Sequence, residues 1–412
     1  METIAPARMG RNFRWLLASS WITNIGDGLA LASGPLLIAS QTHAPLVVAL
    51  AVMLQRLPWL LFGLQAGALA DRLDRRVLVV AVNSARALVL VALAGTIVTG
   101  VVSIAVVLTA MFLLGVAEVF SDTTTSTLLP MVVDKRDLGI GNARIMAGMI
   151  TANQMVGPPI GAALFALGMA FPFVVQAVCV ALGAWLVSRM VTETVPRAAG
   201  PSHVRQDIRE GFRWTWGHAP VRTLTLAIVT FNVTWGAAWS VLVLYSINIL
   251  GMGSVGFGML TSVGAVGGLV GTAAYDWLEG RFSLAWIMRV GLTIETLTHL
   301  ALAVNTSFVV ALVIMFVFGA HAFVWGTTSR TVRMRAVPIE FQGRVASVYM
   351  VGVYGGLVVG SAVGGVIAGL WGVTAPFWFA FVGSAVILGL IWRQLDNIAH
   401  ADEAVLAKSR PR

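Results

Sequence analysis

Residues 45–76 read PLVVALAVMLQRLPWLLFGLQAGALADRLDRR. The stretch 45–69 contains one charged residue, Arg56, and the polar turn that follows contains three arginines. About 20 apolar residues in a helix cross a hydrocarbon core about 30 Å thick, and arginines in short loops stay on the cytoplasmic side of a membrane. These residues therefore predict a membrane-spanning helix that ends at the cytoplasmic face.

The same pattern recurs along the whole chain. Of its 412 residues, 58% are hydrophobic and 11% are charged, a composition that indicates a membrane protein. We predict an all-α membrane protein of twelve transmembrane helices in two pseudo-symmetric six-helix halves. The expected spans are 13–40, 45–69, 77–99, 101–120, 142–167, 171–191, 223–250, 255–278, 285–304, 308–325, 344–370 and 376–392.

The basic residues predict the orientation. Lys and Arg are absent from the six loops expected outside and occur in every loop expected inside, so both termini are expected in the cytoplasm of a bacterial cell with the chain in its inner membrane. Anionic lipid headgroups of the bilayer explain the net charge of +9 without nucleic acid as a partner. The single cysteine, Cys179, lies within the sixth span and excludes an intrachain disulfide.

The longest cytoplasmic stretch divides the spans six and six. We expect an N-terminal half at 1–191, a linker at 192–222 and a C-terminal half at 223–412 with a short cytoplasmic tail. Ile208, Phe212 and Trp216 recur at four-residue spacing in the linker, which predicts an amphipathic helix over 204–216 at the membrane surface.

The two halves resemble each other in sequence. A shift of 203 residues places Thr124, Thr125 and Ser126 on Thr327, Thr328 and Ser329. The same shift places Gly157 and Gly161 on Gly360 and Gly364. Internal repeats of this kind occur in many transporter folds, and glycines four apart allow helices to approach closely.

The turn after the second span carries Gly67, Asp71, Arg72, Arg75 and Arg76. It resembles the signature loop of the major facilitator superfamily, although Asp74 stands where the usual pattern has glycine. Stretches 129–143 and 338–345 resemble the drug:proton antiporter subgroup that includes macrolide, tetracycline and aminoglycoside efflux proteins and enterobactin exporters. Residues 157–161 are similar to an antiporter motif, but Arg144 and Asn153 replace its upstream glycines.

The resemblance implies a role for several of these residues. Spans 1, 4, 7 and 10 are expected to line a central cavity, and spans 2, 5, 8 and 11 to pack at the interface between halves. The implied interface residues are Gly157, Pro158, Gly161, Gly356, Gly360 and Gly364. The implied cytoplasmic latch consists of Gly67, Asp71, Arg72, Arg75 and Arg76, with Asp122 as a partner.

Ionisable residues inside a span need a partner, a watery cavity or a function. Asp27 in span one and Arg56 in span two lie at about the same depth, about 20 Å from the cytoplasmic end. They are expected to meet as an ion pair, which leaves Asp27 either a proton site or a structural counter-charge. We expect Arg86 and Glu118 to form a structural pair or to extend to the membrane surface. We expect Glu295 and His299 to form a local pair, with a transport site as the alternative.

Polar and aromatic residues gather on the expected cavity and interface helices. They indicate contacts to a large, amphipathic and cationic substrate, whereas the alternative is that the aromatic residues anchor helices at the membrane surface. The candidate substrate residues are Asn24, Asn153, Gln154, Asn232, Trp235, Trp239, His321, Trp325, Tyr349 and Tyr354.

The sequence lacks a phosphate-binding loop, a metal-ligand cluster and a nucleophile with a base, so we predict neither an enzyme nor a cofactor. The leading hypothesis is a monomeric secondary transporter that exports a drug-like or amphipathic small molecule in exchange for protons. An importer of a small solute and a membrane protein of sensing or assembly are the alternatives.

Overall fold

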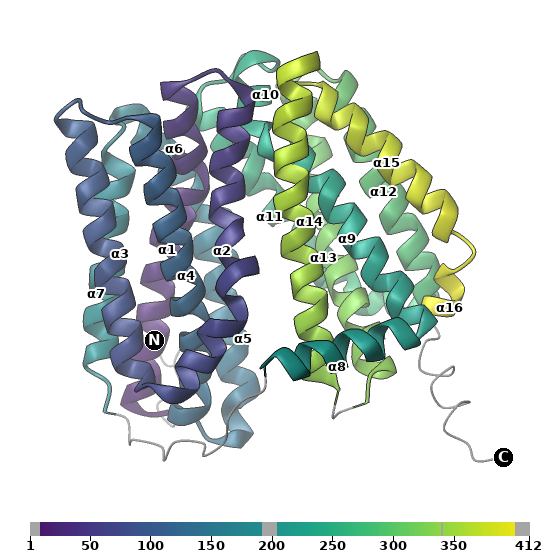
Figure 1. Ribbon diagram of the computed structural model, residues 1–412, viewed down its shortest axis with the longest axis horizontal. Helices are drawn as coiled ribbons and strands as arrows, with labels where there is room; N and C mark the ends of the chain where they lie inside the picture. The colour runs from purple at the N-terminus through teal and green to yellow at the C-terminus, as the bar shows by residue number, and fades with distance from the viewer. Residues whose placement is uncertain (1–8, 192–203, 339–340, 400–412) are drawn as a thin grey trace. The chain divides into compact units, whose positions relative to one another are not determined.

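The computed structural model describes residues 9–191, 204–338 and 341–399, and it is helical throughout those ranges (Figure 1). Ten of its helices are long and apolar enough to cross a membrane. The helices are α1 (Gly10–Gln41), α2 (Pro45–Arg72), α3 (Arg75–Val98), α4 (Ile104–Val132), η2 (Lys135–Asp137), α5 (Leu138–Gly148), the π-helix η3 (Met149–Val156), α6 (Gly157–Leu167), α7 (Phe171–Ser188), α8 (Val204–Gly217), α9 (Ala219–Ser240), α10 (Leu242–Asn248), α11 (Ser254–Arg281), α12 (Leu284–Val304), α13 (Phe308–Ala336), α14 (Gln342–Trp371), α15 (Ala375–Ile391) and α16 (Leu395–Ala399).

The predicted twelve spans are confirmed. The continuous run α5, η3 and α6 forms the fifth span, and the shorter apolar helix α15 forms the twelfth. The seventh span consists of α9 and α10, which are separated at Val241.

Two helices extend beyond their expected ends. We expected spans ending at Phe120 and Trp325, because polar residues follow, but α4 continues to Val132 and α13 to Ala336. The hydroxyl of Thr124 donates to the carbonyl of Phe120 at 2.6 Å, and that of Thr328 donates to the carbonyl of Val324 at 2.9 Å. These hydroxyls bond to their own helix, so the helix continues through polar sequence.

The chain divides into two compact units. Unit 1 consists of residues 1–43, 54–202 and 252–262, and unit 2 of residues 44–53, 203–251 and 263–412. The core of unit 1 includes Phe13, Leu16 and Leu128, and that of unit 2 includes Leu224, Met288 and Leu292. The expected boundaries at 191 and 222 stay predictions.

The glycine repeats lie where helices touch within one unit. A Cβ on Gly161 of α6 would meet the backbone of Leu29 on α1. A Cβ on Gly360 or Gly364 of α14 would meet the backbone of α9. We expected these glycines at the interface between halves, but these contacts are inside each unit, with α6 on α1 in unit 1 and α14 on α9 in unit 2.

The linker prediction of an amphipathic helix is confirmed in α8, which packs on α9 and α14 (Figure 1). Gly211 is buried against the backbone of Arg344, and Glu210 pairs with the Arg344 guanidinium at 2.9 Å. Phe212 and Trp216 stack with ring centroids 5.2 Å apart and remain about half exposed. The aromatic face of α8 is therefore directed away from unit 2.

The contact of α14 with α9 generates a prediction. We expect Gly360→Ala to destabilise the protein by about 1–3 kcal/mol, because its Cβ overlaps the carbonyl oxygen of Val233. A Cβ on Gly369 of the same helix would meet no atom within 4 Å. Gly369→Ala is therefore expected to leave the stability unchanged or to raise it by up to about 1 kcal/mol. Thermal unfolding of both variants in detergent measures the difference, and equal melting temperatures would contradict the close packing.

Candidate functional site

A buried ion pair lies at the centre of the polar residues of unit 1. The Arg86 guanidinium on α3 donates to Oδ1 of Asp27 on α1. The Arg86 side chain is 2% exposed and that of Asp27 is 13% exposed. Two opposite charges removed from water in this way stabilise each other, and loss of one would leave the other unpaired.

Three neutral side chains extend this ion pair. Asn83 accepts from Arg86 at 3.3 Å and from the hydroxyl of Ser121 at 3.1 Å. The Gln176 amide on α7 donates weakly to Asp27 at 3.5 Å. Nε of Arg86 and Oε1 of Gln176 are buried without a partner, so the network retains one donor and one acceptor for a polar group or water.

The predicted pair of Asp27 with Arg56 is wrong. Arg56 is half-buried on α2 and makes no hydrogen bond or ion pair within the described ranges. α1 and α2 do touch, since a Cβ on Gly34 would lie 2.9 Å from Nε2 of Gln55. The partner of Asp27 nevertheless comes from α3. The expected Arg86–Glu118 pair is also wrong, because the Arg86 guanidinium bonds to Asp27 instead.

The glycines beside Asp27 have a packing role. A Cβ on Gly28 would lie 2.8 Å from the carbonyl oxygen of Ala152 in η3, and one on Gly26 would lie 3.1 Å from Cβ of Cys179. Both glycines allow α1 to approach its neighbours and so fix the position of Asp27.

Three further candidates lie in unit 1. Asn153 and Gln154 are in the π-helix η3, half-buried, and π-helical turns often mark functional sites. Asn24 of α1 donates to its own helix at the carbonyl of Ser20, 2.8 Å away. Gly28 brings α1 against Asn153, so the structure places η3 beside Asp27.

The aromatic candidates of unit 2 form a contiguous cluster on α9 and α13. Trp235 stacks on Phe318 with centroids 4.1 Å apart and contacts Trp239 at 4.7 Å. His321 lies 6.2 Å from Phe318 and 6.4 Å from Trp325. The sequence prediction missed Phe318. Its spacing of three residues from His321 places both side chains on one face of α13 and is the signal that could have identified it.

The expected pair of Glu295 with His299 is wrong. Glu295 on α12 instead meets His321 on α13, with 3.3 Å between Oε2 and Nε2. His299 is fully buried, and both of its ring nitrogens lack a partner. Glu295 therefore pairs with His321 of the neighbouring helix α13 and not with His299, which lies one turn away on α12.

The remaining candidates on α9 and α14 are largely satisfied locally. The Tyr349 hydroxyl lies 2.9 Å from that of Ser329, and the Arg333 guanidinium lies 3.4 Å above the Tyr349 ring. Asn232 donates to the carbonyl of Ile228 at 2.8 Å. Tyr354 is half-buried on α14.

The arginines of the turn after α2 bind helix ends within unit 1. Arg75 donates to the carbonyl of Thr127 on α4 at 3.3 Å, and Arg76 donates to the carbonyl of Ser188 on α7 at 2.7 Å. Such contacts are favourable because the carboxyl end of a helix carries partial negative charge.

The other residues of the predicted latch do not take part in these contacts. Asp74 caps α3 by accepting from the Val77 amide at 3.1 Å, which explains an acid where the usual pattern has glycine. Arg72 and Asp122 are exposed, and the Asp71 side chain lies outside the described residues.

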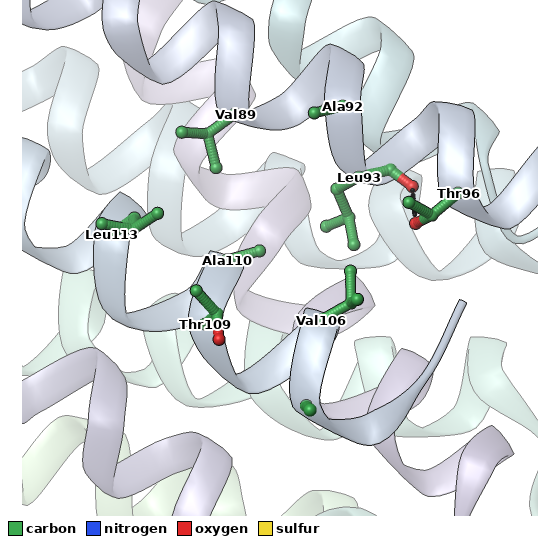
Figure 2. Close-up of a pocket in the computed structure, with 9 residues that line it drawn as sticks. Val89, Ala92, Leu93, Thr96, Val106, Thr109, Ala110 and Leu113 are labelled. Carbon is green, nitrogen blue, oxygen red and sulfur yellow. Dashed lines mark hydrogen bonds between the residues drawn. The ribbon is translucent and has the colours of Figure 1, made fainter. Parts of the chain in front are cut away.

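A groove of about 350 Å³ lies between α3 and α4 and is almost wholly apolar (Figure 2). Thr96 at its rim donates to the carbonyl of Leu93 at 2.8 Å. None of the candidate polar residues lines it. It suits an acyl chain more than a charged substrate.

The fold and the buried polar networks define a polytopic membrane transporter. A family profile described as transmembrane secretion effector matches residues 1–410. The chain belongs to this family of the major facilitator superfamily, and its activity is secondary transport.

Solved transporters share its fold. A mutant of the nucleoside transporter NupG has a TM-score of 0.76 at 11% identity, covering 93% of this chain and 100% of that one. A bacterial homologue of the iron transporter ferroportin has a TM-score of 0.71 at 15% identity, covering 93% and 98%. A bacterial homologue of the lysosomal transporter Spinster has a TM-score of 0.72 at 12% identity, covering 97% and 98%. A search of curated proteins finds no match.

The choice of Arg86 as partner generates a prediction. We expect Arg86→Gln to destabilise the protein by about 3–5 kcal/mol, because it leaves the Asp27 carboxylate buried and unpaired. The double variant Asp27→Asn with Arg86→Gln is expected to recover much of that loss. Arg56→Gln is the matched control and should cost less than about 1 kcal/mol. Unfolding in detergent gives these values, and a larger loss for Arg56→Gln would restore Arg56 as the partner.

Proposed function

We propose that this protein is a secondary exporter that moves an amphipathic, drug-like small molecule out of the cell in exchange for protons. The observation that carries the proposal is the Asp27–Arg86 pair, a carboxylate held among transmembrane helices with one weak neutral donor, Gln176, beside it. The description of the family as secretion effectors supports export. The stacked Trp235 and Phe318 support an amphipathic substrate with a flat ring.

In this proposal, Asp27 alternates between two states. Paired with Arg86, it stays ionised because the guanidinium favours the charged carboxylate. When a conformational change draws Arg86 away, burial favours the protonated acid. Asp27 then takes up a proton from outside as substrate leaves on that side, and releases the proton inside as the next substrate binds.

The proposed role of Asp27 generates a prediction. A resistance panel in a sensitive host first identifies a transported drug. In reconstituted vesicles, Asp27→Asn is expected to reduce accumulation driven by a pH gradient at least about tenfold, because the coupling acid is lost, whereas exchange of labelled drug at equal pH survives. Asp134→Asn removes an exposed acid that pairs with Arg136 and serves as the control.

Three outcomes would contradict the proposal. Retained gradient-driven accumulation in Asp27→Asn would remove Asp27 from coupling. Overexpression that raises intracellular drug would identify an importer instead, and one that leaves it unchanged would favour a sensing or assembly role.

We propose that both termini are cytoplasmic in the bacterial inner membrane. With Cys179 replaced by alanine, Thr306→Cys between α12 and α13 is expected to react with an impermeant reagent from outside. Gly280→Cys near the opposite end of α12 should react only after the membrane is opened, because Arg281 beside it marks the inner face. Both positions are exposed. External labelling of Gly280→Cys would reverse the orientation.

We further propose that the turn after α2 is a conformational latch. Arg75→Ala is expected to slow transport about tenfold with binding nearly unchanged, because a latch shifts the balance between states and does not touch substrate. Arg136→Ala removes an exposed arginine in another cytoplasmic turn and is the control. Transport and drug binding are measured separately on folded protein, and an equal loss of both would contradict the latch.

A further inference from the structure

A second buried ionisable cluster lies in unit 2 and has no arginine or lysine partner within the described residues. Glu295 and His299 come from α12 and His321 comes from α13. The side chains of Glu295 and His321 are 11% and 2% exposed, and His299 is fully buried. Charged or polar groups this deep in a membrane protein are costly unless they have a function.

The hydrogen bonding of the cluster is incomplete. Nε2 of His321 lies 3.3 Å from Glu295, which is longer than the 2.7–2.9 Å usual for a charged pair. Among the described residues, three imidazole nitrogens have no hydrogen-bond partner, namely Nδ1 of His321 and both nitrogens of His299. The cluster therefore has positions that accept a proton without breaking an existing bond.

The helices that pack on α12 add no fixed charge near the cluster. α11 touches α13 at Ala320, and its charged residues Asp276, Glu279 and Arg281 lie beyond that contact. α15 contains no titratable residue, and the only charged residue of α9 is Arg222, near its cytoplasmic end. On α16, Asp396 pairs with Arg289 at 2.6 Å. The arginines of α13 begin at Arg330, more than two turns beyond His321. Trp235 of α9 contacts the His299 ring with centroids 6.2 Å apart.

The position of Glu295 matches that of Arg86 in the other unit. Asp74 caps α3 and Ser283 caps α12, each by accepting from the amide three residues on. Arg86 and Glu295 are both the twelfth residue after their caps. Unit 1 therefore has a permanently charged guanidinium at this position, whereas unit 2 has a carboxylate with a titratable partner.

We propose that Glu295, His321 and His299 form a proton-binding site inside unit 2, in which the Glu295–His321 pair takes up one proton and the unpartnered His299 is a further acceptor for it. The site rests on the proposed proton antiport and adds a second proton carrier to it. A metal is the poorer occupant, because no group of three or more such ligands in the described ranges is arranged to hold one. Imidazole is the side chain whose ordinary pKa lies nearest neutral pH, so the proposal is tested between about pH 5 and pH 8.

The test is infrared difference spectroscopy of the purified full-length protein in lipid nanodiscs between about pH 5 and pH 8. Wild type is expected to show carboxyl and imidazole bands that Glu295→Gln removes together, and that His321→Asn reduces. Asp27→Asn should retain the imidazole bands, which separates this site from unit 1. Glu279→Gln, which removes an acid paired with Arg335, is the matched control and should leave the spectrum unchanged.

If Glu295→Gln does not fold, the variant His299→Phe provides a second test of the proposed site. A purely structural histidine without a partner predicts a higher melting temperature and an unchanged spectrum, and that result would overturn the three-residue site. Loss of drug binding with an unchanged spectrum would make His299 a substrate contact and would also overturn it. Unchanged bands in folded Glu295→Gln would overturn the whole site. Absence of gradient-driven transport by wild type would instead refute antiport and leave the spectroscopic result to stand alone.

Discussion

The hydrocarbon core of a membrane offers no water to backbone or side-chain polar groups, and this constraint determines most of what the structure shows. Backbone groups are paired inside helices. Hydroxyls such as those of Thr124 and Thr328 bond to carbonyls of their own helices, so α4 and α13 continue through polar sequence. Ion pairs between helices have the same cause, since an isolated charge is too costly at this depth.

Two of the buried carboxylates among the described residues, Asp27 and Glu295, meet this constraint in different ways. Asp27 has an arginine, whose guanidinium does not lose its proton in proteins, so the pair changes only when one partner moves. Glu295 has His321, an imidazole 3.3 Å away in place of a guanidinium. In the proposed antiport, the first arrangement couples charge to conformation, and the second adds a proton site in the other unit.

The sequence predicts which segments are helical spans better than it predicts which helices pack against one another. Apolar length determined the twelve spans, and four-residue spacing identified α8, because both signals are local. The partner of Asp27 depends on which helices pack together. Counting residues gave Asp27 and Arg56 similar depths, but α3 supplies Arg86 and α7 supplies Gln176 as the partners of Asp27. Arg86 reaches Asp27 with a long side chain from a helix two spans away in sequence. The same difficulty produced the Glu295–His299 prediction, since spacing along one helix says nothing of a histidine on the next.

The internal repeat conserves packing and not polar chemistry. Gly161 and Gly364 are related by the shift of 203 and serve the same contact in each unit, against α1 and α9. Small residues there are required by backbone geometry, which leaves no room for a side chain. The same shift places Thr230 at the position of Asp27 and His321 at that of Glu118. A buried polar side chain needs only a partner, which different residues can provide, so the partner of the buried acid differs between the two units. A symmetric scaffold thereby holds an acid bound to arginine in unit 1 and an acid beside a histidine in unit 2.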